Sequence, residues 1–228
     1  MKQHLFSLLN KTKNKLLGKY NFYGLINKIT NKKAHQYNNT TSFNRYPEIF
    51  MESVKLVNGE TKNLKILSFG CSTGEECETI LGYFPNSIIT GVDINSLNIN
   101  KAKSSYNHLK QLEFKTSKEF ENELNKKFDL IFCMSVLCRW EDTKDVTNCN
   151  DIYPFKTFEH ILVELDKRLN SNGLFIIYNS NYCFTDTCLN NNYEVISSSI
   201  KDTGFVHKYK SNGERIRSDK HIIFFKKK

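Results

Sequence analysis

The sequence has no apolar run long enough to cross a membrane, and it lacks the cysteine spacing of most zinc and redox sites. Its longest uncharged apolar stretches, at 174–178 and 222–225, fall far short of the roughly 18 residues that a membrane-spanning helix needs. None of the seven cysteines forms a C-x-x-C pair. We therefore expect reduced thiols, no metal site and a cytoplasmic protein.

Acidic residues are absent from positions 1–47, which hold nine of the 33 lysines and arginines. The other 24 basic residues balance the 24 acidic ones, so the formal charge of +9 comes from this first segment alone. Its apolar residues 5–9 give way to lysines without a small-residue cleavage site, so no secretory signal is expected. We expect a basic N-terminal extension over residues 1–45 and a globular domain over residues 46–228.

The extension shows the pattern of an amphipathic helix. Its two faces are formed by Leu5, Leu9, Leu16 and Tyr20 and by Lys11, Lys15 and Lys19. Such a helix either packs its apolar face on the domain and leaves the lysines in water, or it binds an anionic surface, a membrane or a nucleic acid, through residues 1–40. In the second case the protein is peripheral at a membrane surface or bound to nucleic acid.

From residue 63 onward, β-prone apolar segments alternate with helical segments. Strands are expected at 64–69, 87–92, 112–115, 128–134, 174–179, 193–197 and 221–226, and helices at 75–81, 96–104, 117–126 and 154–169. A turn at Asn172-Gly173 is expected to precede the fifth strand, and residues 221–225 to pair antiparallel with Tyr193 at the sheet edge. The pattern predicts an α/β fold, a Rossmann-like, mostly parallel seven-stranded sheet with helices on both faces.

A glycine turn, Gly70-Cys71-Ser72-Thr73-Gly74, follows the first expected strand and is followed by Glu75 and Glu76. A dinucleotide fingerprint needs a further glycine and a helix start that attracts phosphate. Two carboxylates at this helix start repel phosphate and suit a ligand with an ammonium and a sulfonium group, which describes S-adenosylmethionine. Asp93 ends the neighbouring strand, 23 positions after Gly70, where a carboxylate can accept both hydroxyl protons of a ribose.

These segments resemble the class I S-adenosylmethionine-dependent methyltransferases, and among them the chemotaxis-type protein-glutamate methyltransferases. The resemblance is carried by residues 70–76, 91–94 and 128–137, and by Thr41-Ser42-Phe43-Asn44-Arg45, which is similar to a T-x-F-x-R stretch of that family. It implies that Arg45 pairs with the methionine carboxylate, that Thr41 lines the site, and that Glu76 takes the amino end. The remaining cofactor-binding residues that we expect are Gly70, Cys71, Ser72, Gly74, Asp93, Ile94, Met134 and Ser135.

The chain also departs from that family. The family has an asparagine where this chain has Ser135, and it carries a helical domain and a small β-subdomain that read receptor helices. About 40 residues precede the resemblance here, and no room remains for the subdomain. We therefore transfer the cofactor, S-adenosylmethionine, but not the acceptor.

We expect a methyltransferase whose unidentified acceptor is a small molecule or a protein side chain rather than RNA. The alternatives are a non-catalytic adaptor that uses the basic arm, and a nucleotide-binding oxidoreductase. No catalytic residue follows from the sequence, although Asp142, Tyr178, Asn179 and Tyr182 are candidates for a base. The six histidines have no metal-site spacing, and we expect them on the surface or in helices.

Overall fold

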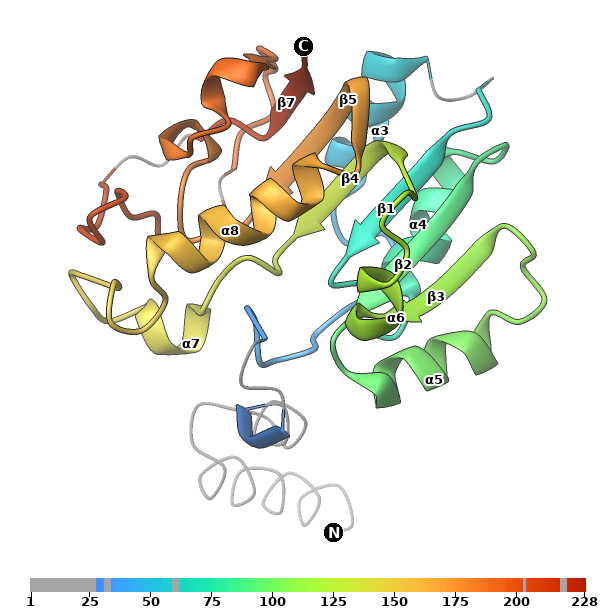
Figure 1. The fold of residues 1–228 in the computed structure, drawn as a ribbon, viewed down its shortest axis with the longest axis horizontal. Coiled ribbons are helices and arrows are strands. Elements are labelled where there is room, and N and C mark those ends of the chain that lie inside the picture. Colours follow the sequence, from blue (N-terminus) through green and yellow to red (C-terminus); the bar gives the residue numbers. More distant parts are fainter. Residues whose placement is uncertain (1–27, 31–33, 59–61, 203, 218–220) are drawn as a thin grey trace, which may run out of the picture.

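The structure is a computed structural model that describes residues 28–30, 34–58, 62–202, 204–217 and 221–228. In this part of the chain seven strands form one sheet in the order β3-β2-β1-β4-β5-β7-β6 (Figure 1). The strands are β1 (Lys65–Phe69), β2 (Ile88–Asp93), β3 (Leu112–Thr116), β4 (Phe128–Met134), β5 (Leu169–Tyr178), β6 (Tyr193–Val195) and β7 (Phe224–Lys227). The seven-stranded α/β sheet expected from the sequence is confirmed.

The five strands from β3 to β5 in this order are parallel, and β7 runs antiparallel to both of its neighbours. All parallel strands therefore end on the same edge of the sheet, where ligands bind in such folds. The antiparallel pairing of the last two strands was expected, but Tyr193 pairs with Lys227 rather than with residues 221–225. The edge strand is β6, because β7 lies between it and β5.

Helices cover both faces of the sheet. They are α3 (Pro47–Val57), α4 (Glu75–Tyr83), α5 (Ser96–Ser105), α6 (Ser117–Glu121), α7 (Trp140–Thr143) and α8 (Phe155–Asp166). Buried residues of α3, α4 and α5 share one apolar cluster with the sheet, and those of α6 and α8 share a second. In Figure 1, α8 lies in front of β4 and β5, on the face opposite α3. The central strands are apolar on both sides because both faces are covered.

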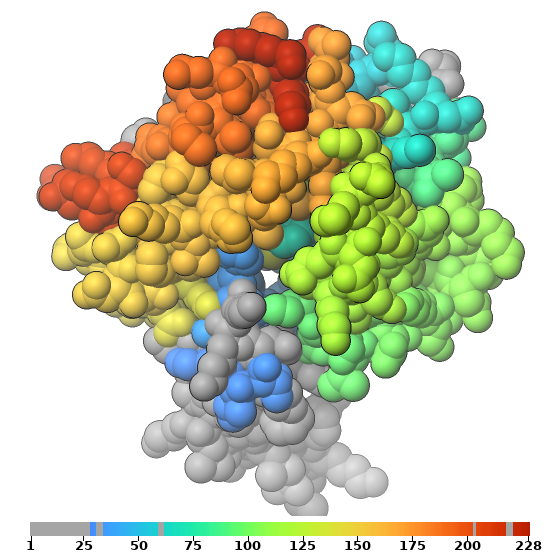
Figure 2. All heavy atoms as spheres, viewed as in Figure 1, coloured from blue at the N-terminus to red at the C-terminus, as the bar shows by residue number. Residues whose placement is uncertain are grey.

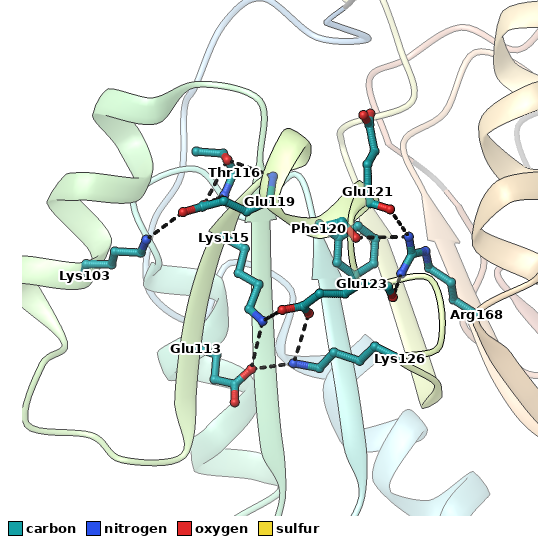
Figure 3. Close-up of polar contacts among 10 residues, drawn as sticks. All are labelled: Lys103, Glu113, Lys115, Thr116, Glu119, Phe120, Glu121, Glu123, Lys126 and Arg168. Atoms are coloured by element: carbon teal, nitrogen blue, oxygen red, sulfur yellow. Dashed lines mark hydrogen bonds and ion pairs between the residues drawn. The ribbon is translucent and has the colours of Figure 1, made fainter.

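Two expected boundaries were wrong for identifiable reasons. The helix from residue 117 ends at Glu121 rather than at 126. The chain turns away there because Arg168 donates hydrogen bonds to the carbonyl oxygens of Phe120, at 3.0 Å, and Glu123, at 2.6 Å (Figure 3). The fifth strand begins at Leu169, and Asn172-Gly173 lies inside it where the register with β4 shifts. The turn residues therefore form an irregularity in β5 instead of a loop before it.

The expected amphipathic helix of the N-terminal extension lies outside the described residues. Residues 34–45, which we call the strap, contain no helix or strand, so the helical expectation does not hold for this part of the extension. They lead directly into α3, where Pro47 occupies the first turn. Among the described residues, no helix is long and apolar enough to cross a membrane.

Gly91 lies in the middle of β2, where two cysteine side chains pack closely against it. We expect Gly91→Ala to lower the free energy of unfolding by about 1–3 kcal/mol, because the added methyl group would meet Cys77 Sγ at 2.7 Å and Cys71 Sγ at 2.9 Å. Gly82→Ala in α4 is the control: its methyl group would meet nothing within 4 Å, and stability should be unchanged or higher by up to about 1 kcal/mol. Urea denaturation measures both, and equal effects would contradict the packing argument.

Candidate functional site

A cavity of about 660 Å³ lies at the edge of the sheet where β1, β2 and β4 end. Ten of the eleven residues expected from the sequence to bind a cofactor line it. They are Thr41, Arg45, Gly70, Cys71, Ser72, Glu76, Asp93, Ile94, Met134 and Ser135. Four expected segments that are far apart in the sequence therefore meet around one cavity, and the parallel topology brings the last three of them together.

The glycine turn makes the sharp bend that opens the cavity. Gly70 has φ +83°, and its N–H and that of Cys71 both donate to the carbonyl oxygen of Val92, at 2.8 and 3.0 Å. A side chain at Gly70 would also collide with Val136, at 2.4 Å from the added carbon. Gly74 is the one expected residue that does not line the cavity. It precedes α4 with φ +99°, and a side-chain carbon added there would meet the ring of Tyr106 at 2.7 Å. Its contribution is to the backbone path.

The Asp93 carboxylate joins the two neighbouring strand ends. Its Oδ2 accepts the N–H of Ser72 at 2.9 Å, and its Oδ1 accepts the N–H of Asn95 at 2.8 Å. Burial raises the pKa of Asp93, and these two backbone N–H groups oppose the shift because they stabilise the ionised form. The carboxylate is thus fixed in orientation at the cavity wall, where part of it is left for a ligand.

Glu76 and Arg45 place opposite charges on the same cavity. Glu76, on the first turn of α4, accepts a hydrogen bond from Ser68 Oγ at 2.7 Å. Burial raises its pKa to about 7, although the Ser68 hydroxyl and the positive charge of Arg45 both act to lower it. Arg45 donates to the carbonyl oxygen of Thr40 at 3.1 Å and packs over the ring of Tyr46. A buried acid opposite a guanidinium is the arrangement that a zwitterionic amino acid group needs.

The strap forms one wall of the cavity and is tied to it by polar bonds along its length. Ser72 Oγ donates to the carbonyl oxygen of Asn39 at 3.2 Å, and the N–H of Asn44 donates to Thr79 Oγ1 at 2.9 Å. Toward its beginning, the Gln36 amide donates to Cys138 Sγ at 3.3 Å. The sequence assigned the strap to a separate extension, but in the fold it belongs to the site.

Ser135 ends β4 at φ +57°, a conformation that few residues with a side chain adopt. Its Oγ lies 2.8 Å from the hydroxyl of Tyr46 and accepts from the amide of Asn179 at 3.0 Å. The hydroxyl therefore links α3, β4 and the end of β5 at the cavity. Cys71 is almost fully buried and burial raises its pKa well above the usual value, so its thiol is a small packed group without nucleophilic character.

Two expectations about side chains near the site were wrong. None of the four residues considered as a base lines the cavity: Asp142, Tyr178, Asn179 and Tyr182 all lie outside it, and Tyr182 is fully buried with its hydroxyl bonded to a backbone carbonyl. His35, expected on the surface or in a helix, lines the cavity and bonds to Tyr153. No pattern in the sequence pointed to this residue, because its partner lies 118 positions away.

The central part of the chain is similar to known methyltransferases. Residues 67–150 match the family model described as a methyltransferase domain. A curated relative, malonyl-[acyl-carrier protein] O-methyltransferase 1 of Ilyobacter polytropus, is 35% identical over 86 residues, which are 38% of this chain and 32% of that protein. The chain thus spans about a third of the length of this relative.

Two solved structures are similar at lower sequence identity. PKMT2 from Rickettsia typhi is 24% identical, with a TM-score of 0.43 over 60% of this chain and 26% of that one. The plantazolicin methyltransferase BpumL in complex with SAH is 21% identical, with a TM-score of 0.42 over 66% and 51% of the two chains. The narrower resemblance to chemotaxis-type methyltransferases is not supported by these matches. The residues 67–150 that match the methyltransferase-domain model contain the glycine turn, Asp93 and the end of β4.

Proposed function

We propose that the protein is an S-adenosylmethionine-dependent methyltransferase. The observation that carries this proposal is the charge arrangement of the cavity: Glu76 and Arg45 line it together, Arg45 is close enough to act on the pKa of Glu76, and Asp93 lies at the end of the next strand. Glu76 suits an ammonium group, Arg45 suits a carboxylate, and Asp93 suits a ribose diol. The methyltransferase-domain match to residues 67–150 supports the same reading.

The residues fit this cofactor better than a phosphate-containing one. The Glu76 carboxylate lies at the start of α4, where a pyrophosphate would otherwise be attracted, and Glu75 and Glu78 add negative charge to the same helical turn. A cation next to Glu76 would remove the cost of ionising a buried carboxylate. The cavity therefore favours a positively charged ligand over NAD or NADP, which weakens the oxidoreductase alternative.

The cofactor, when bound, supplies a methyl group on a sulfonium that is already a good leaving group. Methyl transfer then needs few catalytic groups, because alignment of the acceptor with the methyl group and exclusion of water account for much of the rate. In this chain Arg45, Glu76 and Asp93 would fix the orientation of the two ends of the cofactor. The strap would exclude water, since it lines the cavity from residue 34 to residue 45.

The methyl acceptor is a separate question. The curated relative is named for malonyl-[acyl-carrier protein], but the match covers only a third of that protein, so this acceptor is not transferred. A small molecule or a protein side chain remains our proposal. We also retain the domain boundary near residue 45, with the qualification that the strap contributes to the cavity.

Asp93→Asn tests the ribose contact. The amide keeps the size of the side chain but loses the charge, and we expect S-adenosylhomocysteine to bind more weakly by about 1–3 kcal/mol in calorimetric titration. Asp129→Asn is the control, since Asp129 also accepts a backbone N–H, that of Lys65 at 2.9 Å, but lies at the opposite end of the strands. An unchanged affinity in Asp93→Asn would show that the ribose assignment is wrong, and no binding to the unmodified protein at millimolar ligand would contradict the proposed function.

The pKa of Glu76 predicts a pH dependence of cofactor binding. Because burial raises this pKa to about 7, the carboxyl group is mostly neutral at pH 6 and mostly ionised at pH 7.5, and only the ionised form attracts the ammonium group. Affinity for S-adenosylhomocysteine should rise about five- to tenfold over this interval. Glu76→Gln should bind weakly at both pH values. Glu75→Gln, which changes a carboxylate bonded to Thr73, should keep the pH dependence, and its loss there would contradict the assignment to Glu76.

A further inference from the structure

His35 is a titratable side chain of the cavity that the proposed cofactor contacts leave unused. Other titratable residues of the lining are engaged elsewhere or lie in water: Arg168 bonds to main-chain carbonyls, Glu164 pairs with Lys167, and Glu121 and His160 are exposed. His35 is half-buried and begins the strap.

The position of His35 separates it from the ribose end of the cavity. Its ring meets those of Phe69 and Tyr153 edge to face, with centroids 6.5 and 5.7 Å apart. Tyr153 lies between β4 and α8, whereas Asp93 ends β2. Since β4 and β2 flank β1 on opposite sides, the cavity extends from an Asp93 end to a His35 end.

The His35 end has an apolar lining and an opening to the surface. Phe69, Phe120, Val136 and Ile161 line the cavity on the face covered by α6 and α8. In Figure 2 the surface is hollowed between the yellow and orange residues of α8 and the lime residues of α6, and blue atoms of the strap are visible there. This lining suits a molecule with an apolar body.

One ring nitrogen of His35 is fixed by the core. Nδ1 lies 2.5 Å from the hydroxyl of Tyr153, which is 1% exposed. Burial raises the pKa of Tyr153 well above its usual value, so the hydroxyl keeps its proton. In the described part of the chain Nδ1 is the acceptor available to that proton. The ring proton of a neutral His35 is therefore on Nε2, which points away from Tyr153 and has no partner among the described residues.

The imidazole is neutral at physiological pH. Burial, followed by the positive charge of Arg139 and then by His160, lowers the pKa of His35 to about 4. Arg139 is held in place by a hydrogen bond to the carbonyl oxygen of Ala34 and by stacking on Tyr37 at 3.6 Å. A base this weak is a poor proton acceptor, so His35 offers an N–H donor instead.

We propose that His35 binds the methyl acceptor by donating its Nε2–H to a carboxylate or carbonyl oxygen, with the apolar body of the acceptor between α6 and α8. This inference rests on the proposed function and adds a substrate class to it. Tyr153 is a positioning residue that sets the tautomer, and burial together with the positive charge of Arg139 keeps the ring neutral. His35 determines which acceptors bind, and it does not remove a proton from them.

The tautomer can be tested without any ligand. Two-bond ¹H–¹⁵N correlation spectra of the full chain with labelled histidine should show His35, identified by its loss in His35→Gln, protonated at Nε2 from pH 5.5 to pH 8. Tyr153→Phe should give a mixture of tautomers, because Nδ1 loses its donor. A proton on Nδ1, or an imidazolium at neutral pH, would overturn the proposal whether or not the protein is a methyltransferase.

Benzoate, a carboxylate on an apolar ring, serves as the probe of the acceptor end. In the presence of saturating S-adenosylhomocysteine, it should bind the unmodified protein and His35→Gln, whose amide can reproduce the Nε2–H donor. It should bind at least about tenfold more weakly to His35→Leu. His108→Leu, a change on the exposed surface after α5, is the matched control and should bind like the unmodified protein.

The outcomes separate the two proposals. S-adenosylhomocysteine affinity should stay within about twofold in every His35 variant, because His35 lies outside the cofactor contacts. If the cofactor binds but benzoate affinity is equal in His35→Leu and His35→Gln, or benzoate does not bind at all, the acceptor proposal is wrong and the proposed function stands. If S-adenosylhomocysteine does not bind, the proposed function fails, and with it the assignment of His35 to a methyl acceptor.

Discussion

The bend after β1 is the constraint on which the rest of the site depends. Two successive N–H groups, of Gly70 and Cys71, converge on the Val92 carbonyl, and the next one, of Ser72, is bound by the Asp93 carboxylate. The first strand is thereby locked to the end of its neighbour, and α4 must start where it does. Glu76 then faces the cavity because it lies on the first turn of that helix.

The electrostatics of the cavity follow from this geometry. Glu76 and Asp93 are both carboxylates whose pKa is raised by burial, yet they differ in partners: Asp93 accepts backbone N–H groups, and Glu76 accepts one hydroxyl. Asp93 is therefore held rigidly in a preset orientation. The pKa of Glu76 is about 7, so a cationic ligand can favour its ionised form and gain affinity from the charge.

The strap gives the cavity two functional ends. It crosses from the β4 side, where His35 meets Tyr153, to the α4 side, where Asn44 bonds to Thr79. Its anchors are mainly single polar bonds, and few of its side chains are buried. A segment held in this way can move more easily than the sheet.

The alternation of strands and helices could be predicted from the sequence because it depends on local periodicity. The glycine turn and the spacing to Asp93 could be predicted because the turn needs a backbone conformation that glycine allows. Of the eleven residues that the sequence pattern predicted to bind a cofactor, ten line the cavity. Three features depend on the folded chain: residues 34–45 form a cavity wall, α6 stops at Glu121 where Arg168 bonds to the carbonyl oxygens that follow, and His35 packs against Tyr153. Each of these depends on contacts between residues at least 33 positions apart, which leave no periodic trace in the chain.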